Sequence, residues 1–328
     1  MIGTRQKMLN ACVIAAVRPY TMRELPGWGR IYGLLVGGYR QNPRWTGFAP
    51  RWVWGKLHGY EMLIDLASWS NRETYFLGRF YDLPNQLLIK ALVRPGETVV
   101  DIGANEGMIS LIAAQVVGPG GKVISFEPNP VPRAKLEASL ARNGIGWVDI
   151  RAKGLSDEPA TLTLSVPAIN TGEGTFGRSS YDADATAVQA EVRVGDAELG
   201  GTMPRFIKID VEGFELHVLR GLRETLARAR PLVSMEIIGK HLGNAGATPG
   251  EIAAELESAG YRGWHLSTTG RGAALHVELA PAENFGPDTW GDYLWLHRDD
   301  PCAGDIQDRL AGMTMARARL RSRARPRA

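Results

Sequence analysis

The chain has 328 residues, of which 44% are hydrophobic and 22% charged. This composition is typical of a globular protein with an adequate core, and the length fits one large domain with extensions. The formal net charge of +3 is unevenly spread, because residues 1–70 carry nine basic and three acidic side chains and residues 317–327 carry six arginines and no acid. The centre is therefore acidic, which argues against a general nucleic-acid-binding surface, while the basic ends leave contact with anionic lipid or RNA open.

Cysteine usage and the first residues bear on the compartment. The two cysteines, Cys12 and Cys302, lie far apart without metal-ligand spacing, which argues against a disulfide framework and against a zinc site. The apolar run Met8–Val17 is shorter than the ~20 residues that a membrane span needs. Arg5 and Lys7 precede this run, but no small-residue cleavage site follows it, as a signal peptide would require. We therefore expect a cytoplasmic protein without a membrane span.

The first part of the chain predicts a small N-terminal extension or cap, partly helical and partly β-rich, over residues 1–70. Residues 1–50 have no clean period and are expected to be loosely helical. A helical or turn segment is expected near Trp69. Short strands are predicted at Trp52–Trp54, Tyr60–Ile64 and Tyr75–Leu77.

From residue 71 to residue 298, apolar strands alternate with helical segments, which predicts an α/β domain with a doubly wound, mostly parallel, seven-stranded sheet. Its predicted strands are Thr98–Ile102, Lys122–Phe126, Val148–Lys153, Arg205–Val211, Leu232–Ile238, Tyr261–Leu266 and Tyr293–His297, with a further short strand at Ala160–Val166. The predicted helices are Pro84–Val93, Gly107–Val117, Pro132–Arg142, Glu215–Ala229 and Gly250–Ser258. The last two strands follow each other without a helix and are expected to be antiparallel. The basic, low-complexity segment 299–328 is expected to be a disordered tail.

The turn after the first buried strand carries the most informative motif, Val99–Gly107. Gly103 and Gly107 allow the backbone to pass close to a ligand, because glycine has no Cβ atom. Asn105 stands between them, so the three-glycine fingerprint of a dinucleotide-binding turn is missing. Asp101 at the strand end suits the ammonium group of an amino acid, or a water held against it. The alternative is an ordinary strand-to-helix turn with polar capping residues.

Glu127 ends the next strand and lies where open α/β sheets bind ligands, at the carboxyl edge. Its two oxygens can accept both hydroxyl groups of a ribose, which indicates a nucleoside without saying which one. The alternative is a glutamate exposed to solvent in a loop.

A third motif, Phe206–Glu215, places ionic groups in a buried strand. Because side chains alternate along a strand, Lys208, Asp210 and Glu212 share one side. Such groups are costly inside a sheet unless they are paired, so Asp210 and Glu212 are expected to face a cleft at the strand end. A structural alternative is that Lys208 pairs with an acid and that Glu215 favours a helix N-terminus.

Taken together, these stretches resemble the FkbM family of S-adenosylmethionine-dependent methyltransferases. The resemblance covers roughly residues 75 to 298, and its four motifs occur in the expected order: Val100–Gly107, Phe126–Asn129, Gly154–Asp157 and Ile207–Glu215. It implies a class I methyltransferase fold, which is Rossmann-like and has a seven-stranded sheet whose last strand is antiparallel.

The resemblance also implies roles for single residues. Asp101, Gly103 and Asn105 would line the methionine end of the cofactor S-adenosylmethionine, Glu127 would hold its ribose, and Leu155 and Ser156 would lie beside its adenine. Asp82 stands where many members have glutamate, which leaves its contact open. The residues predicted to bind the cofactor are Asp82, Asp101, Gly103, Asn105, Gly107, Glu127, Asn129, Leu155, Ser156 and Asn170.

The predicted reaction is methyl transfer to a hydroxyl group of a sugar or another small metabolite. A general base would take the hydroxyl proton, with Asp210 as the first candidate, then Glu212, then Glu236, and His241 as an alternative. A divalent ion between Asp210 and Glu236 could replace the base, although nothing in the sequence demands a metal. Methylation of RNA or protein, and a non-catalytic cofactor-binding module, are the competing hypotheses. The acceptor and the oligomeric state stay open.

Overall fold

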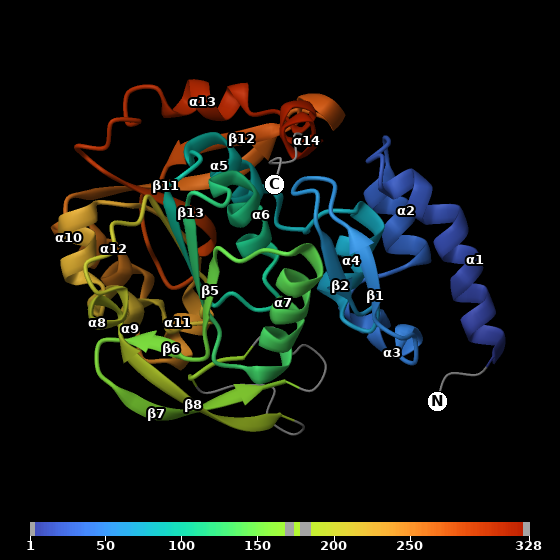
Figure 1. Cartoon of the computed structure of the whole chain (residues 1–328), viewed down its shortest axis with the longest axis horizontal. Coiled ribbons are helices and arrows are strands. Elements are labelled where there is room, and N and C mark those ends of the chain that lie inside the picture. The colour runs from blue at the N-terminus through green and yellow to red at the C-terminus, as the bar shows by residue number, and fades with distance from the viewer. Residues whose placement is uncertain (1–3, 168–173, 178–184, 324–328) are drawn as a thin grey trace.

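A computed structural model describes residues 4–167, 174–177 and 185–323, and its centre is an eight-stranded sheet (Figure 1). In their order across the sheet, the strands are β12 (His276–Pro281), β11 (Tyr261–Thr269), β13 (Trp290–His297), β10 (Leu232–Ile238), β9 (Phe206–Ile209), β3 (Thr98–Ile102), β4 (Lys122–Phe126) and β5 (Val148–Arg151). The five strands from β10 to β5 pair in parallel, whereas β13 runs antiparallel to both β10 and β11. The α/β, mostly parallel fold is as predicted, and so is the antiparallel pairing of β11 with β13.

The prediction of seven strands was one strand short, because β12 adds an antiparallel edge next to β11. Only Val277 and Leu279 of this strand are buried, and two buried positions among six residues form too short an alternation to identify a strand.

The order of the strands explains where a ligand can enter. The chain passes from β3 to β4 and β5 on one side, and then crosses to β9 on the other side of β3. In such open sheets the crevice lies outside the carboxyl ends of the strands at this switch point, which places it between the ends of β3 and β9.

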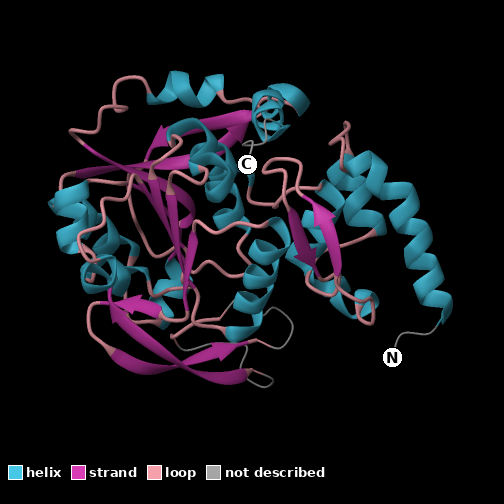
Figure 2. Cartoon of the chain, in the orientation of Figure 1, coloured by secondary structure: helices cyan, strands magenta, loops and turns pink. Residues whose placement is uncertain are grey.

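Helices cover both faces of this sheet, as Figure 2 shows. Strand residues alternate between two cores, with Val99 in the first and Val100 in the second. The first core contains residues of α5 (Leu83–Leu92), α6 (Met108–Val117) and α7 (Pro130–Asn143). The second contains residues of α8 (Gly195–Leu199), α9 (Glu215–Arg220), α10 (Arg223–Ala229), α11 (Gly239–Asn244) and α12 (Pro249–Ser258).

The single helix predicted over Glu215–Ala229 is therefore two helices, α9 and α10. Gly221 lies at the break between them, and a Cβ atom there would lie 2.0 Å from the carbonyl oxygen of Ser156. Close backbone packing against Ser156 thus interrupts a segment whose apolar spacing is otherwise helical.

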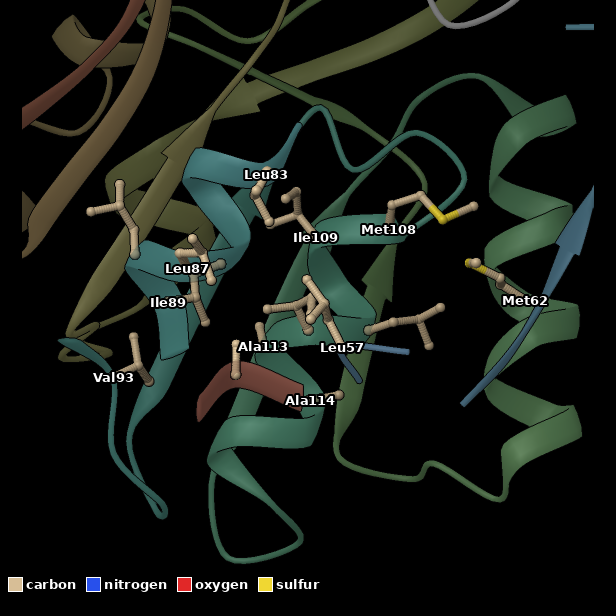
Figure 3. Close-up of a cluster of buried hydrophobic side chains, with 14 of the residues drawn as sticks. Leu57, Met62, Leu83, Leu87, Ile89, Val93, Met108, Ile109, Ala113 and Ala114 are labelled. Carbon is tan, nitrogen blue, oxygen red and sulfur yellow. The ribbon is translucent and has the colours of Figure 1, made fainter. Parts of the chain in front are cut away.

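The N-terminal segment is mainly helical and packs beside α6 and α7. Its elements are α1 (Thr4–Thr21), α2 (Trp28–Leu35), the 3₁₀ helix η1 (Tyr39–Gln41), α3 (Asn42–Trp45), β1 (Arg51–Trp54), β2 (Glu61–Ile64) and α4 (Trp69–Leu77). The predicted strands at Trp52–Trp54 and Tyr60–Ile64 are confirmed as an antiparallel pair. The predicted strand at Tyr75–Leu77 was wrong, because these residues form the last turn of α4. Figure 3 shows Leu57 and Met62 of this segment on the same side of the sheet as Met108 and Ile109 of α6.

A separate three-stranded sheet has the order β6 (Gly154–Ser156), β8 (Thr186–Val194) and β7 (Ala160–Val166). The predicted strand Ala160–Val166 therefore exists, but it lies outside the central sheet. The third strand of the central sheet ends at Arg151 rather than Lys153, and Leu155 and Ser156 belong to the small sheet.

The end of the chain corrects another expectation. Residues 299–323 were predicted to be disordered, yet they contain the helices α13 (Ile306–Gly312) and α14 (Met315–Arg323). Helix α14 contacts the 3₁₀ helix η3 (Gly272–Ala274), which lies between β11 and β12. The apolar positions buried in and between these helices are Ile306, Leu310, Met313, Met315 and Ala318, four of which precede the arginine-rich stretch 317–327 that suggested disorder. Among the described residues, no helix combines the length and apolar character needed to cross a membrane. The division at residues 70 and 298 stays a prediction.

Candidate active site

The turn after β3 is held close to the end of β9. Gly103 and Gly107 both have φ 82°, and Asn105 has φ 50°, a left-handed region that glycine and asparagine tolerate best. A Cβ atom at Gly103 would lie 1.8 Å from the carbonyl oxygen of Asp210. The absence of a side chain at Gly103 is therefore what allows the two strand ends to meet.

Asp101 lies buried at the end of β3, beneath this turn. Ser110 of α6 donates a hydrogen bond to Asp101 Oδ2 at 2.5 Å, and the Ser110 hydroxyl lies 2.8 Å from that of Ser125. Burial raises the pKa of Asp101 to about 6, although the Ser110 hydrogen bond opposes this. Asp101 is therefore oriented from below and is largely ionised at neutral pH.

Glu127 ties the loop after β4 to the turn after β3. Its Oε2 accepts a hydrogen bond from the backbone N–H of Asn105 at 2.7 Å, and its Oε1 accepts one from that of Asn129 at 2.7 Å. Burial raises its pKa to about 7, against the effect of these two bonds. Because a carboxylate offers about four acceptor positions, each oxygen can accept one further hydrogen bond, such as one from a ribose hydroxyl.

Lys208 and Asp210 form an ion pair at the end of β9. The Lys208 side chain is 2% exposed, and its Nζ lies 3.3 Å from Asp210 Oδ2, whereas Asp210 itself is 41% exposed. Burial alone would lower the pKa of Lys208, but the carboxylates of Asp210, Asp292 and Asp82 raise it above its ordinary value. Lys208 is therefore a fixed positive charge next to the acids. Both interpretations of this motif hold, because Lys208 pairs with an acid and Asp210 also lines the cleft.

The turn after β9 brings His241 close to Glu212. Glu212 has φ 54° and Gly213 φ 103°, and Glu215 holds this turn because its Oε1 accepts hydrogen bonds from the backbone N–H groups of Val211 and Gly213. A Cβ atom at Gly213 would lie 2.4 Å from the carbonyl oxygen of His241. This close packing leaves His241 Nδ1 2.9 Å from Glu212 Oε2.

Asp210, Glu212 and Glu236 form a cluster in which one carboxylate oxygen from each lies within 4.8 Å of the others. Burial, and then the charge of Asp210, raise the pKa of Glu236 to about 9. Glu236 is therefore protonated at neutral pH and can donate a hydrogen bond. Three such oxygens are also the type of ligand that a divalent cation accepts.

Asp82 lies at the N-terminus of α5, close to these acids. It accepts hydrogen bonds from the backbone N–H of Asn85 at 3.3 Å and from Asn85 Nδ2 at 2.8 Å, and the same Nδ2 donates to Asp292 Oδ1 at 3.1 Å. Burial and the charge of Asp292 raise the pKa of Asp82 to about 7. The hydrogen bonds of Asn85 thereby hold two acids side by side: Asp82, which precedes α5, and Asp292 of β13.

Two cavities open at the switch point between β3 and β9. The larger, of about 400 Å³, contains Asp82, Asp101, Lys208, Glu236 and Asp292 in its wall, together with the aromatic residues Trp69, Phe80, Tyr81 and Trp290. The smaller, of about 50 Å³, is lined by Glu127 and Asn129 and by the apolar residues Phe126, Leu155 and Phe176. Gly103, Asn105, Asp210 and Glu212 line both, so the two cavities are halves of one cleft.

Most of the predicted site residues line this cleft, but two do not. Gly107 directly precedes α6, and a Cβ atom there would lie 2.2 Å from Leu136 Cδ1, so it faces α7 instead. Ser156 is buried, and its hydroxyl donates to Asp157 Oδ1 at 3.1 Å. Asn170 lies outside the described residues.

Sequence reasoning missed Asp292 and the phenylalanine, tyrosine and tryptophan residues of the larger cavity. Asp292 pairs in register with Glu236 across β13 and β10, and an acid in a strand whose later residues are apolar was the available signal. The rings of Trp69 and Tyr81 are 5.0 Å apart. Tyr81 directly precedes the predicted Asp82, which was the available signal, whereas no local pattern connects Trp69 to the site.

Residues 101–262 match the family described as the methyltransferase FkbM domain. The 31-O-demethyl-FK506 methyltransferase FkbM of Streptomyces tacrolimicus is 30% identical over 201 residues, which are 52% of this chain and 74% of that protein. The chain belongs to the FkbM family of S-adenosylmethionine-dependent methyltransferases. The nocamycin O-methyltransferase of Saccharothrix syringae is 36% identical over 73 residues, which are 22% of this chain and 26% of that protein. The solved structure of methyltransferase FkbM from Methylobacillus flagellatus KT superposes with a TM-score of 0.37 at 15% identity, covering 82% of this chain and 60% of that one.

The cleft of this FkbM-family enzyme fits the cofactor. Its smaller half combines apolar walls, which suit a flat heterocycle, with the Glu127 carboxylate, whose unused acceptor positions suit two adjacent hydroxyl groups. Its larger half begins at Asp101, whose negative charge suits an ammonium group, and continues to the acids of β9 and β10. The polar and apolar parts of S-adenosylmethionine thus find matching walls in one continuous cleft.

Proposed function

We propose that this methyltransferase transfers the methyl group to a hydroxyl oxygen of a sugar or another small hydroxylated metabolite. The observation that supports this most directly is the carboxyl cluster of Asp210, Glu212 and Glu236 in the larger half of the cleft. Groups that accept or donate protons at this place suit an acceptor that loses a proton, such as an alcohol. Two relatives support an oxygen acceptor by their names, which specify O-methyl chemistry.

In this proposal the cofactor is held by residues at three strand ends. Glu127 binds the ribose hydroxyls, Leu155 and its apolar neighbours enclose the adenine, and Asp101 and Asn105 face the methionine end. When bound, S-adenosylmethionine supplies a methyl group that is already activated on a sulfonium, so the protein mainly has to align the acceptor oxygen with it. The acceptor then lies in the larger half of the cleft.

The acids take different roles in this proposal. Asp210 is the base of the proposal, because its side chain is 41% exposed to the cleft and its Oδ2 lies 3.3 Å from the Lys208 ammonium. Glu236, protonated at neutral pH, donates a hydrogen bond that orients the acceptor hydroxyl. The Glu212–His241 pair is the alternative base, since a carboxylate partner strengthens an imidazole as a proton acceptor.

The first test is calorimetric titration with S-adenosylhomocysteine, beside NAD, of the enzyme and of a Glu127→Ala variant. We expect binding of S-adenosylhomocysteine, none of NAD, and strongly weakened binding in the variant. A screen of hydroxylated sugars and metabolites then follows, in which mass spectrometry detects the added methyl group. Binding of the nucleoside without turnover on any hydroxylated acceptor, together with methylation of RNA or protein, would replace this proposal by the competing one.

A further inference from the structure

The outer face of α1 is apolar where a surface helix ordinarily carries charge. Its inner side packs on the protein through Val13, Ile14 and Val17. Between Lys7 and Arg18 the sequence has no charged residue, and the outward positions are apolar or small: Met8, Leu9, Ala11, Cys12, Ala15 and Ala16 are all exposed. A helix that is apolar on both sides is usually covered on both.

The end of α2 extends this exposed face. Leu34 is 83% exposed and Leu35 45%, beside Met8 at 66% and Leu9 at 54% on α1. Arg44 links α1 to the end of α2, because it donates hydrogen bonds to Asn10 Oδ1 of α1 and to the carbonyl oxygen of Leu35 of α2. We call Met8, Leu9, Leu34 and Leu35 the apolar patch; α1 and α2, which carry it, lie at the outer edge of the molecule in Figure 1.

The residues that flank the apolar patch in sequence carry a positive net charge. Residues 4–50 contain seven basic side chains and one acid, Glu24. The Glu24 side chain is 7% exposed and is neutralised by Lys56 at 2.5 Å, Arg79 at 3.0 Å and Arg319 at 3.2 Å. In contrast, the basic residues nearest the patch in sequence, which are Arg5, Lys7, Arg30 and Arg40, are exposed.

We propose that the apolar patch and the basic side chains around it dock the enzyme on an anionic phospholipid surface. Apolar side chains at the level of the headgroups gain free energy by leaving water, and each nearby lysine or arginine adds attraction to anionic lipid. A second copy of this chain fits less well, because like-charged rims would face each other across the interface. The docking helices are linked to the active site through α4. Arg18 and Thr21 of α1 donate hydrogen bonds to the carbonyl oxygens of Tyr75 and Phe76 in α4. Trp69, at the start of α4, lines the cleft.

The test is co-sedimentation of the full chain with vesicles of phosphatidylcholine alone and of phosphatidylcholine mixed with phosphatidylglycerol. We expect binding to the anionic vesicles only, weakening as salt is added. An Arg5→Glu/Lys7→Glu double variant and a Leu34→Glu variant should each bind about tenfold or more weakly. Met203→Glu is the matched control, because Met203 is 55% exposed but lies far along the chain from the patch.

Folding of each variant is checked by its binding of S-adenosylhomocysteine, which the patch does not touch. Absence of vesicle binding by the unaltered chain overturns the proposal, and so does equal weakening by Met203→Glu. Equal binding to the neutral vesicles removes the anionic part of the inference. A dimer in light scattering that Leu34→Glu dissociates would assign the patch to a second copy instead.

Discussion

At the residue scale, the site places chemically similar acids in different environments. Asp210 is exposed to the cleft above a buried lysine, whereas Glu236 is partly buried among other acids. Asp210 and Glu236 lie at neighbouring strands, which suggests equal roles, but the two side chains differ in burial and in the charges next to them. In the proposed mechanism this difference of environment distinguishes the base, Asp210, from the hydrogen-bond donor, Glu236.

The first prediction concerns Asp210→Asn, which keeps the size of the side chain and removes the proposed base. We expect kcat to fall on the order of 10²–10⁴-fold, the usual contribution of a general base. Affinity for S-adenosylhomocysteine should change little, since that ligand carries no acceptor proton. Steady-state kinetics with the identified acceptor and calorimetry with S-adenosylhomocysteine measure the two effects separately.

Glu236→Gln is the matched control for this variant. The pKa of Glu236 is about 9, so at neutral pH the amide replaces a neutral acid and retains a donor. Its loss of kcat should be much smaller than that of Asp210→Asn. If the two variants lose equal activity, the assignment of Asp210 as the base and Glu236 as the donor is wrong.

At the element scale, the cleft depends on two turns that pack backbone against backbone. The turn after β3 meets the end of β9 at Gly103, and the turn after β9 meets α11 at Gly213. Both glycines have positive φ values, so a side chain would cost conformational strain as well as space. These turns bring Asp101, Asp210 and His241 to one place.

The second prediction is that Gly103→Ala damages the fold of the cleft. The added Cβ atom would lie 1.8 Å from the carbonyl oxygen of Asp210, so the strand ends must separate. We expect a loss of several kcal/mol in stability, at the upper end for single substitutions, and loss of S-adenosylhomocysteine binding. Thermal unfolding monitored by circular dichroism and calorimetric titration are the measurements.

Gly29→Ala provides the comparison for Gly103→Ala. Gly29 lies within α2, and no heavy atom would approach a Cβ atom there within 4 Å. Alanine is favoured over glycine inside a helix by about 1 kcal/mol, so this variant should be as stable as the parent or slightly more so. A similar loss in both variants would show that the damage does not come from the contact with Asp210.

The elements that the sequence predicted best are those with long, regular patterns. The buried parallel strands read as continuous apolar runs, and their polar ends, Asp101, Glu127 and Asp210, were recognised because ionic groups at such places need a reason. The elements missed were short or half-exposed, such as β12 and β8. The third helix turn at Tyr75–Leu77 was taken for a strand because three aromatic and apolar residues fit either period.

Residues that form the site through long-range contacts could not be predicted in the same way. Asp292 and Trp290 reach the cleft only because β13 inserts between β10 and β11. Asp82 was predicted by resemblance, but its link to Asp292 through Asn85 depends on contact between α5 and β13. Such contacts arise from the packing of whole elements, which single-sequence patterns do not contain.

At the scale of the whole molecule, the buried acids couple stability to pH. Burial raises the pKa of Asp101 from 3.8 to about 6 and those of Glu127 and Glu215 from 4.5 to about 7. At pH values between the ordinary and the raised pKa of these groups, the folded protein binds more protons than the unfolded chain. Its free energy of unfolding therefore falls as pH rises through this range. Below this window the sign reverses, because ion pairing lowers the pKa of Glu24 to about 2 against the effect of burial.

The third prediction is therefore that the protein without cofactor melts at a higher temperature near about pH 5 than near about pH 8. Asp101→Asn removes one of the contributing groups and should reduce this slope, because its amide does not titrate. Differential scanning calorimetry at several pH values measures both. A melting temperature that rises steadily between these pH values would contradict the raised pKa values.

The C-terminal helices give the fourth prediction, which distinguishes a folded end of the chain from a disordered one. Gln307 of α13 donates to the carbonyl oxygen of Leu279 in β12, so α13 covers the added edge of the sheet. Arg319 of α14 reaches Glu24 at 3.2 Å and joins the end of the chain to the N-terminal segment. The helices also bury several apolar side chains, each of which contributes about 1.5–3 kcal/mol when fully buried.

A chain that ends at Gly304 loses these contacts, and we expect its melting temperature to fall by on the order of ten degrees or more. It should also associate more readily, because Val277 and Leu279 of β12 become exposed beside an uncovered sheet edge. A chain that ends at Arg323 keeps both helices and serves as the control, with a melting temperature like that of the full chain. Equal stability of all three chains would mean that α13 and α14 add nothing to the fold, and that the arginine-rich segment behaves as its composition first indicated.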